Sequence, residues 1–427
     1  MTWAAIVPFA ILAAAFVLRI PVAYGMMSGG IVYLLLKGMS LSNIAGQILG
    51  SLFNSYTVIA VPLFIFSAQV MNSSTVTDRV FDFAKAIVGK RRGGLGHVNC
   101  LASLVFSGMT GSAVADASGL GMMEIDAMRR EGYDDGFSCA ITAASATIGP
   151  IFPPSIPMIM YSLLSGASVG ALFMGGMIPA VMLCIGLMIY VAVIARKRDY
   201  PISTQLARSE FLRTTLRSIP ALLTPIILLG GIYTGVCTPT EAGAVAAFYT
   251  IIIALLVYRT LNWKSMLQVL KVTVKSTGSI GMMIGAAACL SYCVTVEHIP
   301  DSVANFVLSV TTNRYVLLLI INVVFLILGM FIDTQTMLVV FIPIVIPVVK
   351  ELGIDLVHFG VMIILNTMIG MSTPPFGMLL FVTHGISGTP LRDIIREVFP
   401  MIVVMIVVLL LITFVPPLVT FLPGTLL

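Results

Sequence analysis

Charged residues are scarce in this chain of 427 residues. Asp, Glu, Lys and Arg make up 10% of the sequence and hydrophobic residues 59%, whereas a soluble protein carries about 25% charged residues. This composition excludes a predominantly soluble protein, and the mean hydropathy of +1.07 agrees. Apolar runs recur at about 18 or more residues, the length that a helix needs to cross roughly 30 Å of hydrocarbon. We therefore expect an all-α polytopic membrane protein.

Residues that commonly bind metals or nucleotides are also few. The six cysteines lie in apolar segments without a CxxC pair, so we interpret them as small hydrophobic residues of packed helices. The four histidines are scattered, without a cluster at ligand spacing, which argues against a transition-metal site. The sequence has no P-loop, so we do not expect the chain itself to hydrolyse ATP. We do not expect an enzyme. We attribute the net charge of +5 to membrane topology and not to nucleic-acid binding.

Two apolar segments of the chain are interrupted by prolines. The first reads IGPIFPPSIPMIMYS at 148–162, and the second reads IGMSTPPFGMLLFVT at 369–383. Proline removes a backbone donor and clashes with the preceding turn, so neither segment can be one continuous helix. In a bilayer such breaks persist only where protein or a water-filled cavity satisfies the freed carbonyls, and secondary transporters often bind substrate and ions there. We expect broken spans at about 137–164 and 356–386.

A constant shift of 221 residues relates these two segments to one another. It also superimposes further Gly, Pro, Met and Asp residues, and the pairs are Gly108 with Gly329, Met109 with Met330, Gly132 with Gly353, Asp134 with Asp355, Gly149 with Gly370, Pro153 with Pro374 and Pro154 with Pro375. Identities at one offset indicate a duplicated fold. We expect a first repeat at residues 1–195, a cytoplasmic linker at 196–217 and a second repeat at 218–427.

Two segments between the spans have the features of re-entrant hairpins. Residues 96–130 contain short apolar arms around SGMTGSAVADASGLG, and residues 314–350 contain GMFIDTQT at the equivalent place. Positive charge lies at both ends of the first segment, so the simplest arrangement enters the membrane, turns and returns to the same side. Each repeat then has about five spanning helices plus one hairpin, and an odd number of spans inverts the second repeat.

The basic residues give the orientation of this arrangement. If the N-terminus is outside, only Lys37, Arg314 and Lys350 of the 23 basic residues also fall outside. Cytoplasmic loops collect Lys and Arg, so we prefer this orientation.

Four further segments are expected at the membrane interface, and separate spans are expected after them. The interfacial segments are 41–56, 77–89, 263–275 and 301–311. A span of its own is expected at 280–296, and a single last helix is expected at 399–421.

Two hairpin tips and two helix breaks that meet at mid-membrane would form one central site. The N-termini of half-helices present N–H groups to an anion, while unwound carbonyls and side-chain oxygens suit Na⁺. The candidate side-chain oxygens belong to Ser107, Thr110, Ser112, Ser145, Thr147, Thr334, Thr336, Asn366, Ser372 and Thr373. Hydroxyls in membrane helices also commonly bond to their own backbone carbonyls, and this alternative stays open for each of them.

Three carboxylates lie at predicted membrane depth, where an acid is costly and therefore a candidate site. Asp333 follows the second hairpin's Gly329 and is the best candidate for ion binding or gating. Asp116 could instead cap the second arm of its hairpin. Glu241, in CTPTEAG, is interpreted as a cap at the start of a helix.

Together these motifs resemble the large membrane subunit of TRAP transporters, the DctM-like permeases. The resemblance is carried by FSGMTGSAVADASGLG, TIGPIFPPSIPMIMY, GVCTPTEAGAVAA, GMFIDTQTMLVVFIPIVIPVVKELGID and MIGMSTPPFGMLLFV, and it runs nearly end to end. It implies Na⁺-driven secondary import of an organic anion such as a dicarboxylate, sialic acid or another sugar acid. It also implies an elevator-type fold in the bacterial inner membrane, where the outside N-terminus expected from the basic residues would be periplasmic.

The resemblance further implies partners and ion sites. The partners are a small four-helix membrane subunit, DctQ-like and here expected as a separate chain, and a periplasmic substrate-binding protein, DctP-like. One Na⁺ site would form where 108–112 meets 149–154, and a second where 329–333 meets 370–376. The residues that this adds to the candidate site are Gly108, Gly111, Gly149, Phe152, Pro153 and Pro154, with Gly329, Gly370, Pro374, Pro375 and Phe376 in the second half.

Two alternatives from other functional classes remain. A passive anion channel could use the same re-entrant loops as a selectivity filter. An intramembrane hydrolase could be built on Ser118 or Ser112, although no histidine is associated with either serine in the sequence.

Overall fold

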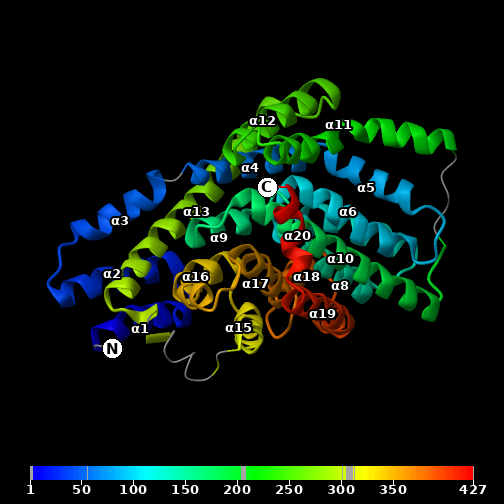
Figure 1. The fold of residues 1–427 in the computed structure, drawn as a ribbon. Helices are drawn as coiled ribbons and strands as arrows, with labels where there is room; N and C mark the ends of the chain where they lie inside the picture. The colour runs from blue at the N-terminus through cyan, green and yellow to red at the C-terminus, as the bar shows by residue number, and fades with distance from the viewer. Residues whose placement is uncertain are drawn as a thin grey trace.

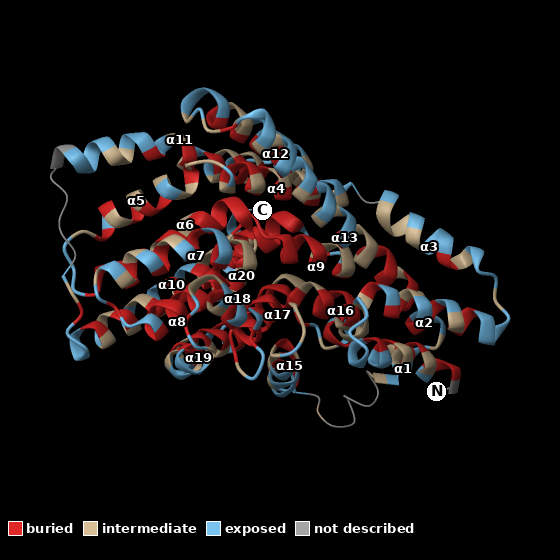
Figure 2. Ribbon diagram, turned by 180° about the vertical axis from the view of Figure 1, so that it is seen from behind, coloured by how far each residue is buried: buried red, intermediate tan, exposed pale blue. Residues whose placement is uncertain are grey.

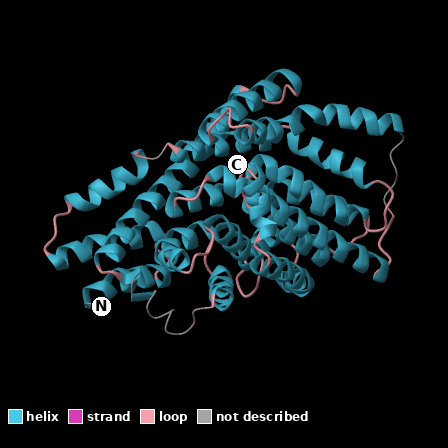
Figure 3. Ribbon diagram, viewed as in Figure 1, coloured by secondary structure: helices cyan, strands magenta, loops and turns pink. Residues whose placement is uncertain are grey.

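The computed structural model describes residues 3–54, 56–202, 208–300, 302–303, 311 and 313–426. These residues form helices joined by loops, and no strand occurs among them (Figure 3). The helices of the first half are α1 (Trp3–Val17), α2 (Val22–Lys37), α3 (Ser42–Phe53), α4 (Thr57–Asn72), α5 (Val76–Val88), α6 (Gly94–Thr110), α7 (Ala113–Arg130), α8 (Asp135–Ser145), α9 (Ile156–Ser165) and α10 (Val169–Lys197). Those of the second half are α11 (Arg208–Tyr233), α12 (Pro239–Ile252), α13 (Trp263–Val296), α15 (Arg314–Gly329), α16 (Thr334–Glu351), α17 (Leu356–Met371), α18 (Met378–Ser387), α19 (Leu391–Phe414) and α20 (Pro417–Leu426).

Apart from α5, which packs on both α6 and α11, the helices form two groups that each draw on both halves of the chain. We call α1–α4 and α11–α13 the frame helices, because α4 packs on α12 and α13, and α13 packs on α2 and α3. We call α6–α10 and α15–α20 the hairpin group, in which α7 packs on α8 and α18, and α10 packs on α6, α19 and α20. Figure 1 shows α1, α2 and α3 at one end of the molecule and α9, α16, α17 and α20 near its middle.

The most buried part of the molecule is the hairpin group. Figure 2 shows largely buried ribbon along α6, α9 and α17, and more exposed ribbon on α3, α11 and α12. Phe106, Phe137, Tyr161, Phe173 and Phe359, from five different helices of this group, are each at most 1% exposed. Since membrane-facing surface is also apolar, burial and not hydrophobicity separates the core from the outer faces.

The helix ends repeat at the shift of 221 residues. The shift carries both ends of α7 onto both ends of α16, and it carries the start of α8 onto the start of α17. It carries α9 to within one residue of α18. The same local signals, glycine and proline between apolar runs, therefore end and begin helices at equivalent places in the two halves.

One predicted boundary is wrong, because α13 is a single helix of 34 residues. The sequence analysis divided it into an interfacial segment and a span at the polar stretch around 276–279. That stretch contains no proline, and a single glycine inside a helix costs only about 1 kcal/mol. Packing on α2, α3, α4 and α16 offsets this cost. In the first half, α3 and α4 fill the equivalent place and are bent by 59°.

The predicted single last helix at 399–421 is also wrong. α19 begins at Leu391 and ends at Phe414, and α20 begins at Pro417. Pro416 and Pro417 explain the interruption, because each lacks an N–H and disfavours helical backbone in the residue before it. α20 packs against α10.

Three other expectations need comment. The predicted linker at 196–217 is partly helical, since α11 begins at Arg208, and residues 203–207 lie outside the described part. The interfacial segment expected at 301–311 lies largely outside it as well. The hairpin arms are longer than expected: α6 has 17 residues, and α7 and α16 have 18 each.

Six described helices are long and apolar enough to cross a membrane, or seven if α3 and α4 count as one bent span. The six segments are Val169–Lys197, Glu210–Tyr233, Pro239–Val257, Trp263–Val296, Thr334–Glu351 and Leu391–Phe414. The chain is therefore a polytopic membrane protein. The fifth segment is α16, an arm of the second predicted hairpin.

Ion pairs fasten the two halves together at one end of the hairpin group. Arg129, at the end of α7, pairs with Asp135 at 2.8 Å and donates to the Ser387 carbonyl after α18 at 2.9 Å. Arg198, after α10, pairs with Asp134 at 3.0 Å and with Glu397 of α19 at 2.8 Å. Such pairs fix the relative positions of the helices more than they add net stability.

Tyr200 adds a neutral donor to this ion-pair cluster. Its hydroxyl donates to Asp134 at 2.6 Å. Burial, followed by the hydrogen bond to Asp134, raises the pKa of the Tyr200 phenol. The phenol therefore keeps its proton, and the hydrogen bond persists at physiological pH.

Candidate functional site

The first hairpin tip packs directly on the first helix break. α6 ends at Thr110, Gly111 reverses the chain with φ +60°, and Ser112 caps α7 by accepting from the Ala115 N–H at 3.4 Å. A side chain at position 111 would clash with the Pro154 carbonyl. Glycine at 111 is therefore required both by its positive φ and by the close approach of the two backbones.

The second tip and break pack in the equivalent way. Asp333 caps α16, accepting from the Thr336 N–H at 3.1 Å and from its hydroxyl at 2.6 Å. The Gly377 N–H, after the break, donates to the Met330 carbonyl at 3.2 Å. A Cβ on Gly370 would lie 2.7 Å from the Gly329 backbone, so only glycine permits this contact.

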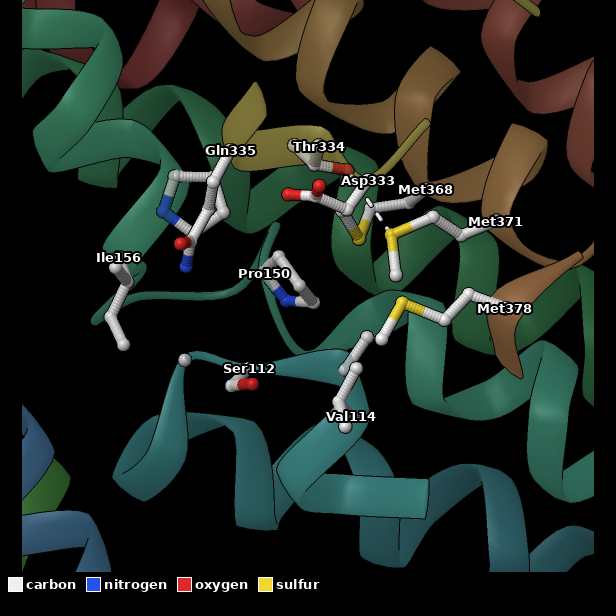
Figure 4. A pocket seen from close by; sticks show the side chains of 13 residues that line it. Ser112, Val114, Pro150, Ile156, Asp333, Thr334, Gln335, Met368, Met371 and Met378 are labelled. Atoms are coloured by element: carbon white, nitrogen blue, oxygen red, sulfur yellow. Dashed lines mark hydrogen bonds between the residues drawn. The ribbon is translucent and has the colours of Figure 1, made fainter. Parts of the chain in front are cut away.

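The two tips and two breaks enclose a central cavity of about 240 Å³. Figure 4 shows Ser112 and Val114 on one side of it and Asp333, Thr334 and Gln335 facing them from the other. Met368, Met371 and Met378 form one end. The cavity thus lies between elements of the first and second halves.

Four helices point their N-termini at this central cavity. Its lining includes the first residue of each of these helices: Ala113 of α7, Ile156 of α9, Thr334 of α16 and Met378 of α18. Each helix N-terminus carries unpaired N–H groups and a partial positive charge. Their convergence makes the cavity suited to an anion.

Seven of the predicted site residues line the central cavity or one of two cavities beside it. Gly111, Ser112, Asp333 and Thr334 line the central cavity. Gly329 and Phe376 line a neighbouring cavity of about 310 Å³, which Asp333 also borders. Thr110, together with Ser112, lines another cavity of about 480 Å³.

The other predicted residues lie behind these surfaces. Among the described cavities none is lined by Ser107, Gly108, Ser145, Gly149, Phe152, Pro153, Pro154, Thr336, Asn366, Gly370, Thr373, Pro374 or Pro375. The glycines and prolines among them shape the breaks, and both Pro-Pro bonds are cis.

Several of the candidate hydroxyls donate to nearby backbone carbonyls, as the alternative interpretation predicted. Ser107 donates to the Ser103 carbonyl of its own helix. Thr147 donates to the Ala144 carbonyl at 2.6 Å. Ser372 and Thr373 both donate to the Ile369 carbonyl, at 3.0 and 2.6 Å. Thr334 differs, since its hydroxyl contacts the Met371 sulfur at 3.2 Å.

The alternative that Asp116 caps its helix is wrong, because Ser112 is the cap of α7. Asp116 lies one turn further on and is 2% exposed, and its carboxylate oxygens accept no hydrogen bond within the described chain. The capping interpretation of Glu241 is confirmed. Its carboxylate accepts from the N–H and hydroxyl of Thr238, both at 2.8 Å.

The sequence analysis did not single out the polar network within the first hairpin. The Asn99 amide donates to Glu124 at 2.8 Å and to Thr142 at 2.7 Å, and its oxygen accepts from Ser145 at 2.6 Å. Ser103 extends the network to Ser145 at 3.1 Å. An Asn and a Glu at membrane depth were signals for this network.

In the second half, Asn366 stands at the place of Ser145. Its amide donates to the carbonyl and the side-chain oxygen of Asn322, both at 2.8 Å. Asn322 in turn donates to Thr413 at 3.0 Å. Asn366 thus joins α17 to α15 behind the break.

Lys275 and Gln335 were also missed as site residues. Gln335 follows Thr334 in the tip motif, so its place there was a usable signal. Lys275 had been assigned to an interfacial segment, because α13 was expected to end before the next span. The hydrolase alternative gains nothing from the geometry, since Ser118 is exposed and donates to the Val114 carbonyl of its own helix at 2.7 Å.

Comparison with solved structures finds a similar fold. The crystal structure of the Alcanivorax borkumensis YdaH transporter aligns with a TM-score of 0.67 over 96% of this chain and 99% of that one. The sequence identity is 13%, so this likeness concerns the fold alone.

Comparison of sequences gives much higher similarity. The sialic acid TRAP transporter large permease protein SiaM of Vibrio cholerae is 41% identical over 94% of either chain. The sialic acid TRAP transporter permease protein SiaT of Haemophilus influenzae is 39% identical over 95% of this chain and 66% of its own length. The C4-dicarboxylate TRAP transporter large permease protein DctM of Pseudomonas aeruginosa is 35% identical over 93% of either chain.

Family membership follows from these matches. Residues 9–418 match the family described as the tripartite ATP-independent periplasmic transporter, DctM component. The relatives bear the names of transporter permeases, which points to transport and not to catalysis. The chain belongs to the DctM family and is a large permease component of the TRAP transporter type.

Proposed function

We propose that this permease imports an organic carboxylate together with Na⁺. The observation that carries the proposal is the convergence of four helix N-termini on the central cavity between the halves. None of the described residues that line this cavity is Lys or Arg. Backbone dipoles would therefore supply the positive potential that holds the carboxylate.

Na⁺ would bind at the two places where a tip packs on a break. The proposed sites are 108–112 with 149–154, and 329–333 with 370–376. Asp333 supports the second site, because its carboxylate borders the central cavity and the neighbouring one. Backbone carbonyls freed at the breaks and the nearby hydroxyls would complete an oxygen shell for a hard cation.

The transport step in this proposal is an elevator movement of inverted repeats. The frame helices would stay fixed while the hairpin group, which carries both tips and both breaks, slides against them. The division of the packing into these two groups supports the idea. Coupling requires that ion and substrate together favour the closed, movable state.

The substrate and partners follow from the relatives. Their names include sialic acid and C4-dicarboxylate, so we propose an acid of these classes. The family description names a tripartite, periplasmic transporter. We accordingly propose a small membrane subunit and a periplasmic binding protein as partners, the bacterial inner membrane as the location, and a periplasmic N-terminus.

Uptake into proteoliposomes tests the proposal. The permease is reconstituted with its small subunit and binding protein, and radiolabelled N-acetylneuraminate and succinate are offered with the Na⁺ gradient imposed or collapsed. Accumulation of one acid that needs the gradient and all three proteins is expected. Equal flux without the gradient would contradict the proposal and favour a passive channel, an alternative that the names of the relatives do not support.

A further inference from the structure

A second cavity lies between the frame helices and the first hairpin tip. This side cavity has a volume of about 480 Å³. Ser112, Ile156 and Gln335 line both the side cavity and the central cavity, so the two adjoin. On its other face the side cavity is lined by α4 and α13.

Polar side chains form part of the lining of the side cavity, and one of them is cationic. Lys275, Ser276 and Ser279 line it from α13, and Gln69 lines it from α4. No acidic residue is among the described residues of the lining. The central cavity has no cationic side chain, so the two cavities differ in the kind of positive group they present.

Thr110 is a second indication that this cavity receives a polar ligand. The residue is 2% exposed and lines the side cavity. Its hydroxyl finds no hydrogen-bond partner within the described chain. A buried polar group without a partner costs about 1–3 kcal/mol, and rotation of the Thr110 side chain toward the cavity would let a ligand remove that cost.

Lys275 lies well inside the length of its helix, and its side chain is exposed. It lies twelve residues after the start of α13, about 18 Å along the axis at 1.5 Å per residue. Among the described residues no carboxylate lies within ion-pair distance of its ammonium. Because Lys275 also lines the side cavity, its ammonium is available to an anion bound there.

We propose that Lys275 binds the substrate carboxylate in the side cavity, next to the central cavity. The Lys275 ammonium would donate to a carboxylate oxygen in a charge-assisted hydrogen bond. Thr110, Ser276, Ser279 and Gln69 would bind the hydroxyl groups of a polyhydroxylated acid. This inference rests on the proposed function, because it assigns a second position to the same substrate.

The chain supplies a matched control for this lysine. Lys271 lies one turn earlier on α13 and is exposed, as Lys275 is, but it does not line the side cavity. Lys271→Met removes the same charge from the same helix. Lys275→Met keeps most of the aliphatic side chain, Lys275→Gln keeps a donor, and Lys275→Arg keeps the charge.

The test measures equilibrium binding of radiolabelled N-acetylneuraminate and succinate to the purified permease with its small subunit, in saturating Na⁺. For the acid that binds, Lys275→Met should raise Kd about tenfold, the loss of one charge-assisted hydrogen bond. Lys271→Met should leave Kd unchanged, and Lys275→Arg should stay within about threefold. The methyl ester of the acid should bind the wild type and Lys275→Met equally, because each change removes the same interaction.

The outcomes separate this inference from the proposed function. If the wild type neither binds nor accumulates an acid, the proposed function fails. If the wild type transports but Lys275→Met and Lys275→Gln keep its Kd and its preference for acid over ester, this inference is overturned. Equal losses in the Lys271 and Lys275 variants would also overturn it. Melting temperatures verify that the variants fold. If Lys275→Met and Lys275→Gln do not fold, the Kd of Lys275→Arg is compared with that of the wild type instead.

Discussion

At the scale of single residues, the contact between Gly329 and Gly370 is the tightest in the second half of the site. A methyl group at 370 would lie 2.7 Å from backbone atoms, which cannot rotate away as a side chain could. Gly370→Ala should therefore separate the tip from the break, at an overpacking cost of about 1–3 kcal/mol. We expect the initial rate of Na⁺-driven uptake to fall about tenfold or more.

Gly385→Ala is the matched control for that substitution. Gly385 is in α18, and a Cβ there meets nothing within 4 Å. Alanine favours helix over glycine by about 1 kcal/mol, so uptake and melting temperature should be retained. Normal uptake by Gly370→Ala would mean that the tip and break tolerate separation.

Substitution of Asp333 by Asn separates the capping role of this side chain from its negative charge. Asn is as good an N-cap as Asp, so Asp333→Asn should keep α16 folded and change the melting temperature little. If the carboxylate binds Na⁺, the Na⁺ concentration for half-maximal uptake should rise about tenfold. The measurement is the Na⁺ dependence of initial uptake rates.

Asp355→Asn provides the comparison. Asp355 caps α17 by accepting from the His358 N–H at 2.8 Å, and it is remote from both tips in the sequence. Na⁺ dependence should be unchanged in this variant. An unchanged Na⁺ requirement in Asp333→Asn as well would remove Asp333 from the proposed ion site.

At the scale of helices, the network around Asn99 holds the first hairpin to the first broken helix. Asn99→Leu would leave the hydrogen-bonding groups of Glu124, Thr142 and Ser145 without this partner in a buried place. Each such group costs about 1–3 kcal/mol. A fall in the melting temperature of the purified protein by several degrees is expected.

Asn43→Ala is a useful reference for the Asn99 substitution. Asn43, on α3, makes one long contact to the Tyr292 hydroxyl at 3.4 Å and is partly exposed. Its removal should change the melting temperature far less. Similar shifts for the two variants would show that the Asn99 network contributes little.

The same scale explains what the sequence could and could not predict. The tips and breaks were predictable, because Gly111, Gly370 and the proline pairs act locally on the backbone. The continuity of α13 was not predictable, because packing on neighbouring helices keeps its polar stretch helical. The position of Lys275 was lost with it, and the Asn99 network needs contacts between residues far apart in the chain.

At the scale of the molecule, the hydrogen bond from Arg129 to Ser387 and the ion pair of Arg198 with Glu397 join the two halves within the hairpin group. The proposed elevator needs this group to move as one body while its contacts with the frame change. The side cavity lies on that boundary and offers residues from both sides of it, namely Gln69 of α4 and Ala115 of α7. A covalent link between them should stop the movement.

Paired cysteines test this directly in a Cys237→Ser background, since Cys237 is the free cysteine that is not buried. A short bifunctional maleimide should abolish uptake by Gln69→Cys with Ala115→Cys, because it ties the hairpin group to the frame. Asn43→Cys with Tyr292→Cys joins α3 to α13 within the frame, and neither residue lines the side cavity, so its cross-linking should leave uptake intact. Full uptake by both cross-linked pairs would exclude sliding at this boundary and require another route across the membrane.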